Sequence, residues 1–312
     1  MASPFASPPP AGTPAARLVP EPRPRAWEPP ADRERIGPGD ERQRVDDTWA
    51  VPYRWICSLD VTWPDGMFGR GSGTLVGPRQ VLTAAHCIYR RGDAVGPSSV
   101  YVAPARNGRT DPVGRFKAVA YSTSSAYFAT RVIGRRQIPG PQVESRFDIA
   151  LVTLERNVAD VVYDRARDPR PFGHWGHVHE GHFTRLRGLD GGFLTGKPVT
   201  VAGYPGDWCG RIRVGAGPCD QRRDLATVPF SGPGVVRVDV HQPGLLLHTA
   251  DTDQGQSGSP VWMRFGDGTR YLVGVHVGPG TRDADTGLAL NNRAVHLDQL
   301  VVALIRSWMP DV

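Results

Sequence analysis

A serine in a glycine-rich loop is the first feature of the sequence that could do chemistry. Residues 251–260 read Asp-Thr-Asp-Gln-Gly-Gln-Ser-Gly-Ser-Pro, with glycines at 255 and 258 on either side of Ser257. Gly255 has no Cβ, so the loop can turn sharply and aim successive backbone N–H groups into one small space. This suits acyl transfer, in which the Ser257 hydroxyl attacks a carbonyl and the N–H groups of Gly255 and Ser257 hold the oxyanion. Taken alone, the motif is equally typical of an ordinary Gly/Ser turn.

A histidine far upstream shifts the interpretation towards catalysis. Serine is a poor nucleophile at its free pKa and needs a base, and His86 follows the apolar run 81–85 among small residues. The base in turn needs a carboxylate that fixes its tautomer. Asp148 is the candidate, because it opens the apolar run 147–154, where an ionised carboxylate is costly unless it is paired. The plainer alternatives are a packed core histidine and an aspartate at the start of a strand.

The elements that must position these residues are short strands. The sequence holds 37 glycines and 30 prolines, as expected of many turns. Residues 53–62 alternate with period two, and Pro64-Asp65-Gly66 predicts a hairpin turn after them. We expect further strands at residues 73–76, 80–84, 100–103, 116–121, 147–154, 198–203, 235–241, 244–249, 260–263, 271–276 and 288–291.

The end of the chain has a different period. Apolar residues recur at helical spacing between 295 and 309, which predicts an amphipathic helix, whereas residues 155–195 give no clear pattern. The succession of strands predicts an all-β fold of two antiparallel barrels followed by a C-terminal helix.

The first 35 residues differ in composition from the rest. Eleven prolines lie at or before Pro38, mixed with Ala, Arg and Glu. Such a segment cannot bury apolar surface, so residues 1–35 are expected to be a disordered tail or a removable pro-segment, and residues 36–312 a single domain.

Composition also limits the partners. The net charge is +6, but Lys and Arg form no long run, so a solvated basic surface is a better interpretation than nucleic-acid binding. The sequence contains no run of about 18 apolar residues, so no membrane span is expected. A polyanion binder remains a rival, and it would lose affinity steeply with salt.

Together the motifs resemble the chymotrypsin-like serine peptidases. The resemblance rests on Thr-Ala-Ala-His-Cys at 83–87, Asp-Ile-Ala-Leu at 148–151 and Gly-Gln-Ser-Gly-Ser-Pro at 255–260, and on the chain order His86, Asp148, Ser257. It implies two six-stranded β-barrels with the active site between them, a monomer that acts on polypeptide substrates, and no metal or other cofactor. A catalytically dead relative that only binds a partner is the second rival.

Within this family, the chain most resembles the bacterial glutamyl endopeptidases. The shared motifs are Ile-Gly at 36–37, Gly-Pro at 77–78, Arg-Asn-Gly at 106–108 and Gly-Tyr-Pro-Gly-Asp at 203–207. It implies that His276, on the strand that walls the specificity pocket, and the hydroxyl of Thr252 bind a substrate glutamate. Asp251 favours the opposite specificity, because trypsin-type enzymes keep an aspartate six residues before the serine to bind Arg or Lys. The resemblance across the whole core favours cleavage after glutamate, and specificity for Arg or Lys through Asp251 is the alternative.

The resemblance also bears on maturation. Trypsin-type zymogens use an aspartate just before the serine to capture a new N-terminal amine, and the neutral Gln256 stands there instead. The family implies that a cleaved N-terminus near Ile36 helps to shape the pocket. It also implies secretion, which conflicts with residues 1–10, since they lack the basic-then-apolar pattern of a signal peptide. Another export route, a start that omits the signal, and retention inside the cell all remain open.

The disulfide pairing of the cysteines and the role of a histidine-rich segment each have more than one interpretation. Cys209 and Cys219 could close a short loop as a disulfide, and Cys57 could pair with Cys87, but neither pairing follows from sequence. In the family, the partner of the cysteine after the catalytic histidine lies where Gly71 stands. Residues 173–182 contain four histidines among glycines, and we expect a surface loop there rather than a zinc site.

Overall fold

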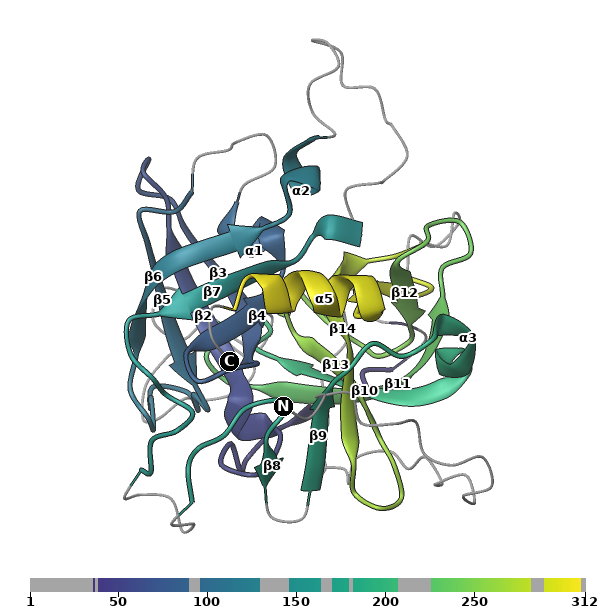
Figure 1. Cartoon of the computed structure of the whole chain (residues 1–312), viewed down its shortest axis with the longest axis horizontal. Helices are drawn as coiled ribbons and strands as arrows, with labels where there is room; N and C mark the ends of the chain where they lie inside the picture. The colour runs from purple at the N-terminus through teal and green to yellow at the C-terminus, as the bar shows by residue number, and fades with distance from the viewer. Residues whose placement is uncertain are drawn as a thin grey trace, which may run out of the picture.

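The computed structural model describes residues 36, 39–89, 96–129, 146–163, 170–179, 182–206, 226–281 and 289–309 (Figure 1). The expected tail at residues 1–35, and the pair Cys209 and Cys219, lie outside the described residues. In the part of the chain that is described, no helix is long and apolar enough to cross a membrane.

The first barrel is built from the N-terminal half of the described chain. Its six strands close in the order β2-β3-β4-β7-β6-β5, and every neighbouring pair is antiparallel. Alternate residues point inward, such as Leu59 and Val61 of β2, which are buried. The strands are β2 (Ile56–Thr62), β3 (Phe68–Leu75), β4 (Gln80–Thr83), β5 (Ser99–Pro104), β6 (Phe116–Thr123) and β7 (Ala150–Leu154).

The second barrel follows the same plan. Its strands run in the order β13-β10-β11-β12-β15-β14, and the pairing of β13 with β14 closes the ring. These strands are β10 (Lys197–Gly203), β11 (Phe230–Val238), β12 (Leu245–His248), β13 (Pro260–Arg264), β14 (Arg270–Pro279) and β15 (Asn292–His296). Three short strands extend this sheet: β1 (Gln43–Arg44) on β11, β9 (His182–Leu186) parallel to β14, and β8 (Val178–His179) on β9.

Few helices accompany the barrels within the described residues. They are α1 (Ala85–Ile88), α2 (Ser125–Ala129), α3 (Gly191–Leu194), α5 (Gln299–Ser307) and a 3₁₀ turn at Tyr53–Trp55. Helix α5, yellow in Figure 1, crosses the middle of the view between the two barrels. Its apolar face joins a core cluster that contains residues of both barrels.

A row of tryptophans fills the seam between the barrels. Trp175 lies between Trp55 and Trp262, with ring centroids 5.6 and 6.1 Å away. All three rings are buried, and the indole N–H groups of Trp55 and Trp175 donate to the Phe172 carbonyl and the Thr74 hydroxyl, at 2.8 Å each. The seam is therefore a packed and hydrogen-bonded joint.

The predicted architecture is confirmed: the fold is all-β, with two closed six-stranded antiparallel barrels and a C-terminal helix. Several boundaries were wrong; strands β3 and β11, for example, begin at Phe68 and Phe230 instead of residues 73 and 235. Residues 53–55 form a 3₁₀ turn, because the Trp55 N–H reaches back to the Pro52 carbonyl at 3.0 Å. The last strand is β15 at Asn292–His296 rather than residues 288–291.

The C-terminal helix also starts later than the apolar spacing predicts. Val295 belongs to strand β15, and the helix begins only after Asp298, whose carboxylate accepts the Val301 N–H at 2.8 Å. This aspartate is an N-cap, and capping marks the true start of the helix.

Candidate active site

The three residues of the predicted triad come from separate elements of the two barrels. His86 lies in α1 directly after β4, and Asp148 lies two residues before β7. Strands β4 and β7 are antiparallel neighbours in the first barrel, which brings the two residues together. Ser257 lies on the loop between β12 and β13 of the second barrel.

Asp148 holds His86 through two hydrogen bonds. One carboxylate oxygen lies 2.7 Å from the ring Nδ1 of His86, and the other accepts the backbone N–H of His86 at 2.9 Å. Burial lowers the pKa of His86, but Asp148 and the neighbouring Cys87 outweigh it and hold the pKa well above its usual value. The pair is therefore arranged to stabilise an imidazolium, as a base that accepts a serine proton requires.

The serine loop is fixed against the first barrel by hydrogen bonds from β3. The Ser72 N–H donates to the Ser257 carbonyl at 2.8 Å, and the Ser72 hydroxyl donates to the Gly255 carbonyl at 2.8 Å. A Cβ on Gly258, whose φ is +87°, would lie only 2.0 Å from the Ser72 carbonyl oxygen. A glycine is needed there both for the backbone conformation and for the close approach of the two chains.

The proposed oxyanion donors lie on the same loop. Gly255 has a φ of +95°, and the peptide that carries its N–H is held through the Gln254 carbonyl, which accepts the Gly206 N–H at 2.7 Å. Within the described residues, the N–H groups of Gly255 and Ser257 donate to no other group. They can therefore receive the oxygen of a substrate carbonyl.

Asp251 is engaged by the start of the described chain. Its two carboxylate oxygens accept the backbone N–H groups of Ile36 at 2.8 Å and Glu41 at 2.7 Å. Burial raises the pKa of Asp251, and these two hydrogen bonds partly offset that rise. The carboxylate is thus directed at residues 36–41.

Gln256, in the place of the zymogen aspartate, is also held by its neighbours. Its side-chain oxygen accepts the Asp253 N–H at 3.0 Å and lies 3.5 Å from a guanidinium nitrogen of Arg42. Arg42 itself pairs with Asp40 at 2.7 Å. The amide is therefore a neutral hydrogen-bonding group at this position.

His276 lies in a buried pair that the sequence did not reveal. Its Nδ1 is 3.1 Å from Nε2 of His248, and the two rings meet edge to face with centroids 5.2 Å apart. His276 also binds the serine loop through its backbone, since its N–H donates to the Ser259 carbonyl at 2.9 Å and its carbonyl accepts the Gly258 N–H at 2.7 Å. The wall strand β14 is thus joined to the nucleophile loop.

Burial keeps this histidine pair neutral. It lowers the pKa of His248 to about 3 and, together with the nearby His248 and His86, lowers the pKa of His276 well below its usual value. The register explains why sequence reasoning missed His248: β15 lies between β12 and β14 and pairs with both. The contact is visible only once that strand order is known.

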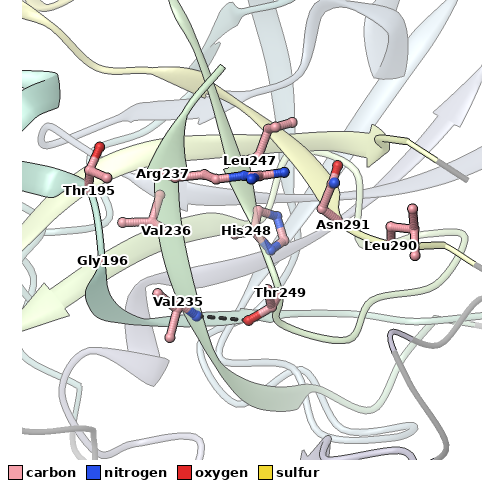
Figure 2. Close-up of a pocket in the computed structure, with 10 residues that line it drawn as sticks. All are labelled: Thr195, Gly196, Val235, Val236, Arg237, Leu247, His248, Thr249, Leu290 and Asn291. Carbon is pink, nitrogen blue, oxygen red and sulfur yellow. Dashed lines mark hydrogen bonds between the residues drawn. The ribbon is translucent and has the colours of Figure 1, made fainter. Parts of the chain in front are cut away.

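A cavity of about 420 Å³ borders the pair on its His248 side. Figure 2 shows His248 among the residues of β11 and β12 that line it, with the Val235 N–H bonded to the Thr249 hydroxyl at 2.9 Å. No residue of the predicted triad lines this cavity, and neither does His276. It is therefore separate from the place where Ser257 would meet a substrate.

The disulfide that Cys57 and Cys87 could have formed is not present, because both are free thiols. Cys57 is buried, and burial raises the pKa of its thiol. A Cβ on Gly71 would lie 3.3 Å from the Cβ of Cys87 and 2.8 Å from its sulfur. The position facing Cys87 is therefore the one that Gly71 occupies, and glycine carries no sulfur to bridge it.

The histidine-rich segment is described only in part. His174 and His177 meet edge to face at 5.6 Å, and burial lowers the pKa of His174. The side chains of His179 and His182 lie outside the described residues. Among the residues that are described, no group of three or more His, Cys, Asp or Glu side chains could hold a metal ion.

Comparison with known proteins agrees with this geometry. The model of the trypsin-like peptidase domain matches residues 71–275, more than half of the chain. The chain belongs to the trypsin-like peptidase family. A solved Glu endopeptidase in complex with MPD has the same fold, with a TM-score of 0.61 and 22% identity over 88% of this chain and 98% of that one.

Two curated bacterial proteins are similar in sequence. A glutamyl endopeptidase of Bacillus licheniformis is 27% identical over 223 residues, which cover 72% of this chain and 53% of that protein. An extracellular metalloprotease of Bacillus subtilis is 23% identical over 243 residues, covering 78% of this chain and 62% of that protein. The chain thus spans little more than half the length of these relatives. It is a chymotrypsin-like member of the peptidase family with similarity to glutamyl endopeptidases.

The neutral histidine pair makes stability depend on pH. An unfolded histidine takes up a proton near pH 6.5, whereas buried His248 resists protonation down to about pH 3. Between these values the unfolded state binds more protons, so the free energy of unfolding should fall as the pH falls, by about 1.4 kcal/mol per pH unit for this residue. Urea unfolding at pH 7, 6, 5 and 4 measures the slope.

A His248→Asn variant should show a shallower slope than the parent protein. His241 is exposed, so a His241→Asn variant should keep the parent slope and serves as the matched control. Equal slopes for the parent and the His248→Asn variant would contradict the burial of a neutral imidazole.

Proposed function

We propose that the chain is a serine endopeptidase that cleaves polypeptides through Ser257, His86 and Asp148. The observation that carries the proposal is the pair of hydrogen bonds that the Asp148 carboxylate accepts from His86, in a fold whose second barrel presents Ser257 on a fixed loop. His86 accepts the proton of the Ser257 hydroxyl as its oxygen attacks the peptide carbonyl, and then gives the proton to the leaving amine.

The intermediate oxyanion is held by the N–H groups of Gly255 and Ser257. Collapse of the tetrahedral intermediate releases the amine product and leaves an acyl-enzyme on Ser257. Water, deprotonated by the same His86, then hydrolyses that ester and restores the serine.

Substitution of each of the three proposed triad residues tests the assignment. Ser257→Ala and His86→Ala should each lower kcat on a peptide ester by about 10⁶, since triad members act as a unit. Asp148→Asn should cost about 10⁴, because the ring of His86 then takes the wrong tautomer. Variants that keep more than a few per cent of the activity would contradict the assignment.

Labelling by a fluorophosphonate separates an enzyme from a binding protein of the same fold. The parent protein should be labelled at Ser257, and the Ser257→Ala variant should not. An unlabelled but fully folded parent protein would favour the binding protein.

We further propose that the enzyme prefers glutamate before the cleaved bond. His276 lies on the strand that is bonded to the serine loop, and in one tautomer of the pair His248 donates to its Nδ1, so that its N–H is at Nε2. A neutral donor can bind a carboxylate in a buried pocket without first burying a charge. Thr252, which is buried directly after Asp251, is the second proposed contact.

The Asp251 contacts weigh against specificity for Arg or Lys. An aspartate that selects a basic residue must direct its carboxylate at the substrate, yet both oxygens of Asp251 accept N–H groups of residues 36 and 41. A guanidinium would have to displace these hydrogen bonds. This contrast between His276 and Asp251 favours the glutamate preference.

The ratio of kcat/KM for matched peptides with Glu, Asp, Arg or Phe before the cleaved bond tests this preference. Glu should be fastest, Asp slower because its shorter side chain does not reach the same donors, and Arg and Phe slowest. His276→Leu should cost Glu peptides about 2–5 kcal/mol of transition-state binding. Asp251→Asn should create no loss specific to Arg peptides, and faster cleavage of Arg than Glu peptides would overturn the preference.

We propose also that residues 1–35 are removed and that the new N-terminus at Ile36 completes the pocket. The nitrogen of Ile36 lies 2.8 Å from the Asp251 carboxylate, and cleavage before Ile36 would turn this N–H into an ammonium group. The resulting ion pair would offset the cost of burying the carboxylate. It would also fix the backbone of Asp251, and with it the adjacent Thr252.

Two chains provide the test. One starts at Ile36, and the other carries one additional residue before Ile36. The chain that starts at Ile36 should have a kcat/KM at least tenfold higher on the same peptide, and Asp251→Asn should abolish the difference. Equal activity of the two chains would contradict a role for the N-terminal amine, whatever residue the pocket prefers.

A further inference from the structure

A buried arginine, Arg42, connects the start of the described chain to the loop that carries Ser257. It directly precedes strand β1, which is paired with β11 through Gln43 and Ser231. The Arg42 side chain is only 4% exposed. A Cβ on Gly232 would lie 3.5 Å from Cγ of Arg42, so the stem of the side chain packs against β11. The second barrel therefore sets the position of this arginine, through backbone pairing and packing.

Asp40 fixes the orientation of the guanidinium group. Nε and Nη2 of Arg42 donate to the two carboxylate oxygens of Asp40, at 2.9 and 2.7 Å. One of these oxygens also accepts the backbone N–H of Arg42 at 3.0 Å, and the Asp40 side chain is 0% exposed. Two parallel hydrogen bonds hold a planar guanidinium in one orientation. The third nitrogen, Nη1, takes no part in this fork.

Nη1 of Arg42 reaches the side chain that precedes the proposed nucleophile. It lies 3.5 Å from the side-chain oxygen of Gln256, and both residues are buried. The same oxygen accepts the Asp253 N–H at 3.0 Å. The amide nitrogen of Gln256 has no hydrogen-bond partner among the described residues, so the amide is held through its oxygen. Away from water, a charged donor attracts such an oxygen more strongly than it does in solution.

Gln256 closes the turn that carries the proposed oxyanion donors. Its backbone N–H donates to the Asp253 carbonyl at 3.0 Å, and its side-chain oxygen accepts the Asp253 N–H. Residues 253–256 thus form a turn that is bonded twice between its two ends. Gly255 lies within this turn and Ser257 directly follows it, so the direction of their N–H groups depends on Gln256. A displacement of about 1 Å at such a position can lower the rate by about 10²-fold.

We propose that Arg42 is a positioning residue for oxyanion binding. Its charge, oriented by Asp40, holds the Gln256 amide, and through that amide it holds the turn that directs the two proposed oxyanion donors. Loss of Arg42 therefore lowers kcat and leaves KM almost unchanged. The role rests on the proposed peptidase activity, but neither on the preference for glutamate nor on the removal of residues 1–35.

Three variants of the full chain separate positioning from folding. Truncation of Arg42 alone would leave the buried Asp40 carboxylate unpaired and destabilise the protein, so the double variant Asp40→Asn/Arg42→Met removes both charges together. Gln256→Met keeps the unbranched shape of the side chain and removes only the amide. Arg44→Gln is the matched control, because Arg44 lies two residues further along the chain and pairs with Asp46 at 3.3 Å.

The double variant and Gln256→Met should each lower kcat about tenfold on the same peptide, with KM within about twofold of the parent value. The second-order rate constant for labelling of Ser257 by a fluorophosphonate should fall by a similar factor, because the phosphoryl oxygen occupies the oxyanion site. The double variant should melt near the parent temperature, and Arg44→Gln should keep the parent kcat and labelling rate.

A mutant cycle shows whether Arg42 acts through Gln256. Removal of the ion pair should lower kcat about tenfold in the parent background and have almost no effect in the Gln256→Met background. Equal losses in both backgrounds would show that Arg42 acts by another route and would overturn the proposal.

Other outcomes would also overturn the positioning role. One is a parent kcat in a folded double variant, and another is a raised KM at unchanged kcat, which would place Arg42 in substrate binding. If the double variant does not fold, a parent kcat in Gln256→Met, which leaves the ion pair intact, contradicts the same link. A folded parent protein that is not labelled at Ser257 would remove the proposed peptidase activity and this role together, whereas an active parent with unaffected variants would remove this role alone.

Discussion

The proposed catalytic arrangement depends on one serine that is not itself proposed to react. Ser72 binds the nucleophile loop through its N–H and its hydroxyl, accepts the Tyr204 N–H at 2.9 Å, and is held through its carbonyl by the Thr83 hydroxyl at 2.7 Å. These bonds join β3, β4, β10 and the loop at 255–258. Because Ser72 is fully buried, each bond is made away from competing water, where an unmade one is costly.

Such close approach dictates small residues around Ser72. A Cβ on Gly203 would lie 1.9 Å from the Ser259 hydroxyl and 2.7 Å from that of Ser72. A Cβ on Gly258 would clash with the Ser72 carbonyl. The glycines are therefore required by packing, in addition to the oxyanion geometry first inferred for the loop. The two barrels are joined at the proposed active site by backbone contact, and elsewhere along the seam by tryptophan packing.

The sequence predicted the parts of the molecule that depend on local pattern. Alternation of apolar residues located most strands, and the residues around His86, Asp148 and Ser257 indicated their chemistry before any distance was known. What could not be predicted depends on register and on long-range contact. His248 meets His276 only because β15 pairs with both of their strands, and the partner of Asp251 lies more than 200 residues away, at Ile36. The start of α5 was predicted too early for a different reason. Val295 and Leu297 are buried at the end of strand β15, but their spacing also fits a helix.

The placement of β15 and α5 has a consequence for synthesis. Strand β15 is needed to close the second barrel, and Val301, Val302 and Ile305 of α5 complete the core that both barrels share. These residues are translated after everything else in the described chain, so the nucleophile loop at 255–258 has left the ribosome before the barrel that holds it can close. The first barrel, with His86 and Asp148, is complete by residue 154. Assembly of the proposed reactive site therefore waits for the last described residues, and a nascent or truncated chain holds the proposed triad residues without their alignment.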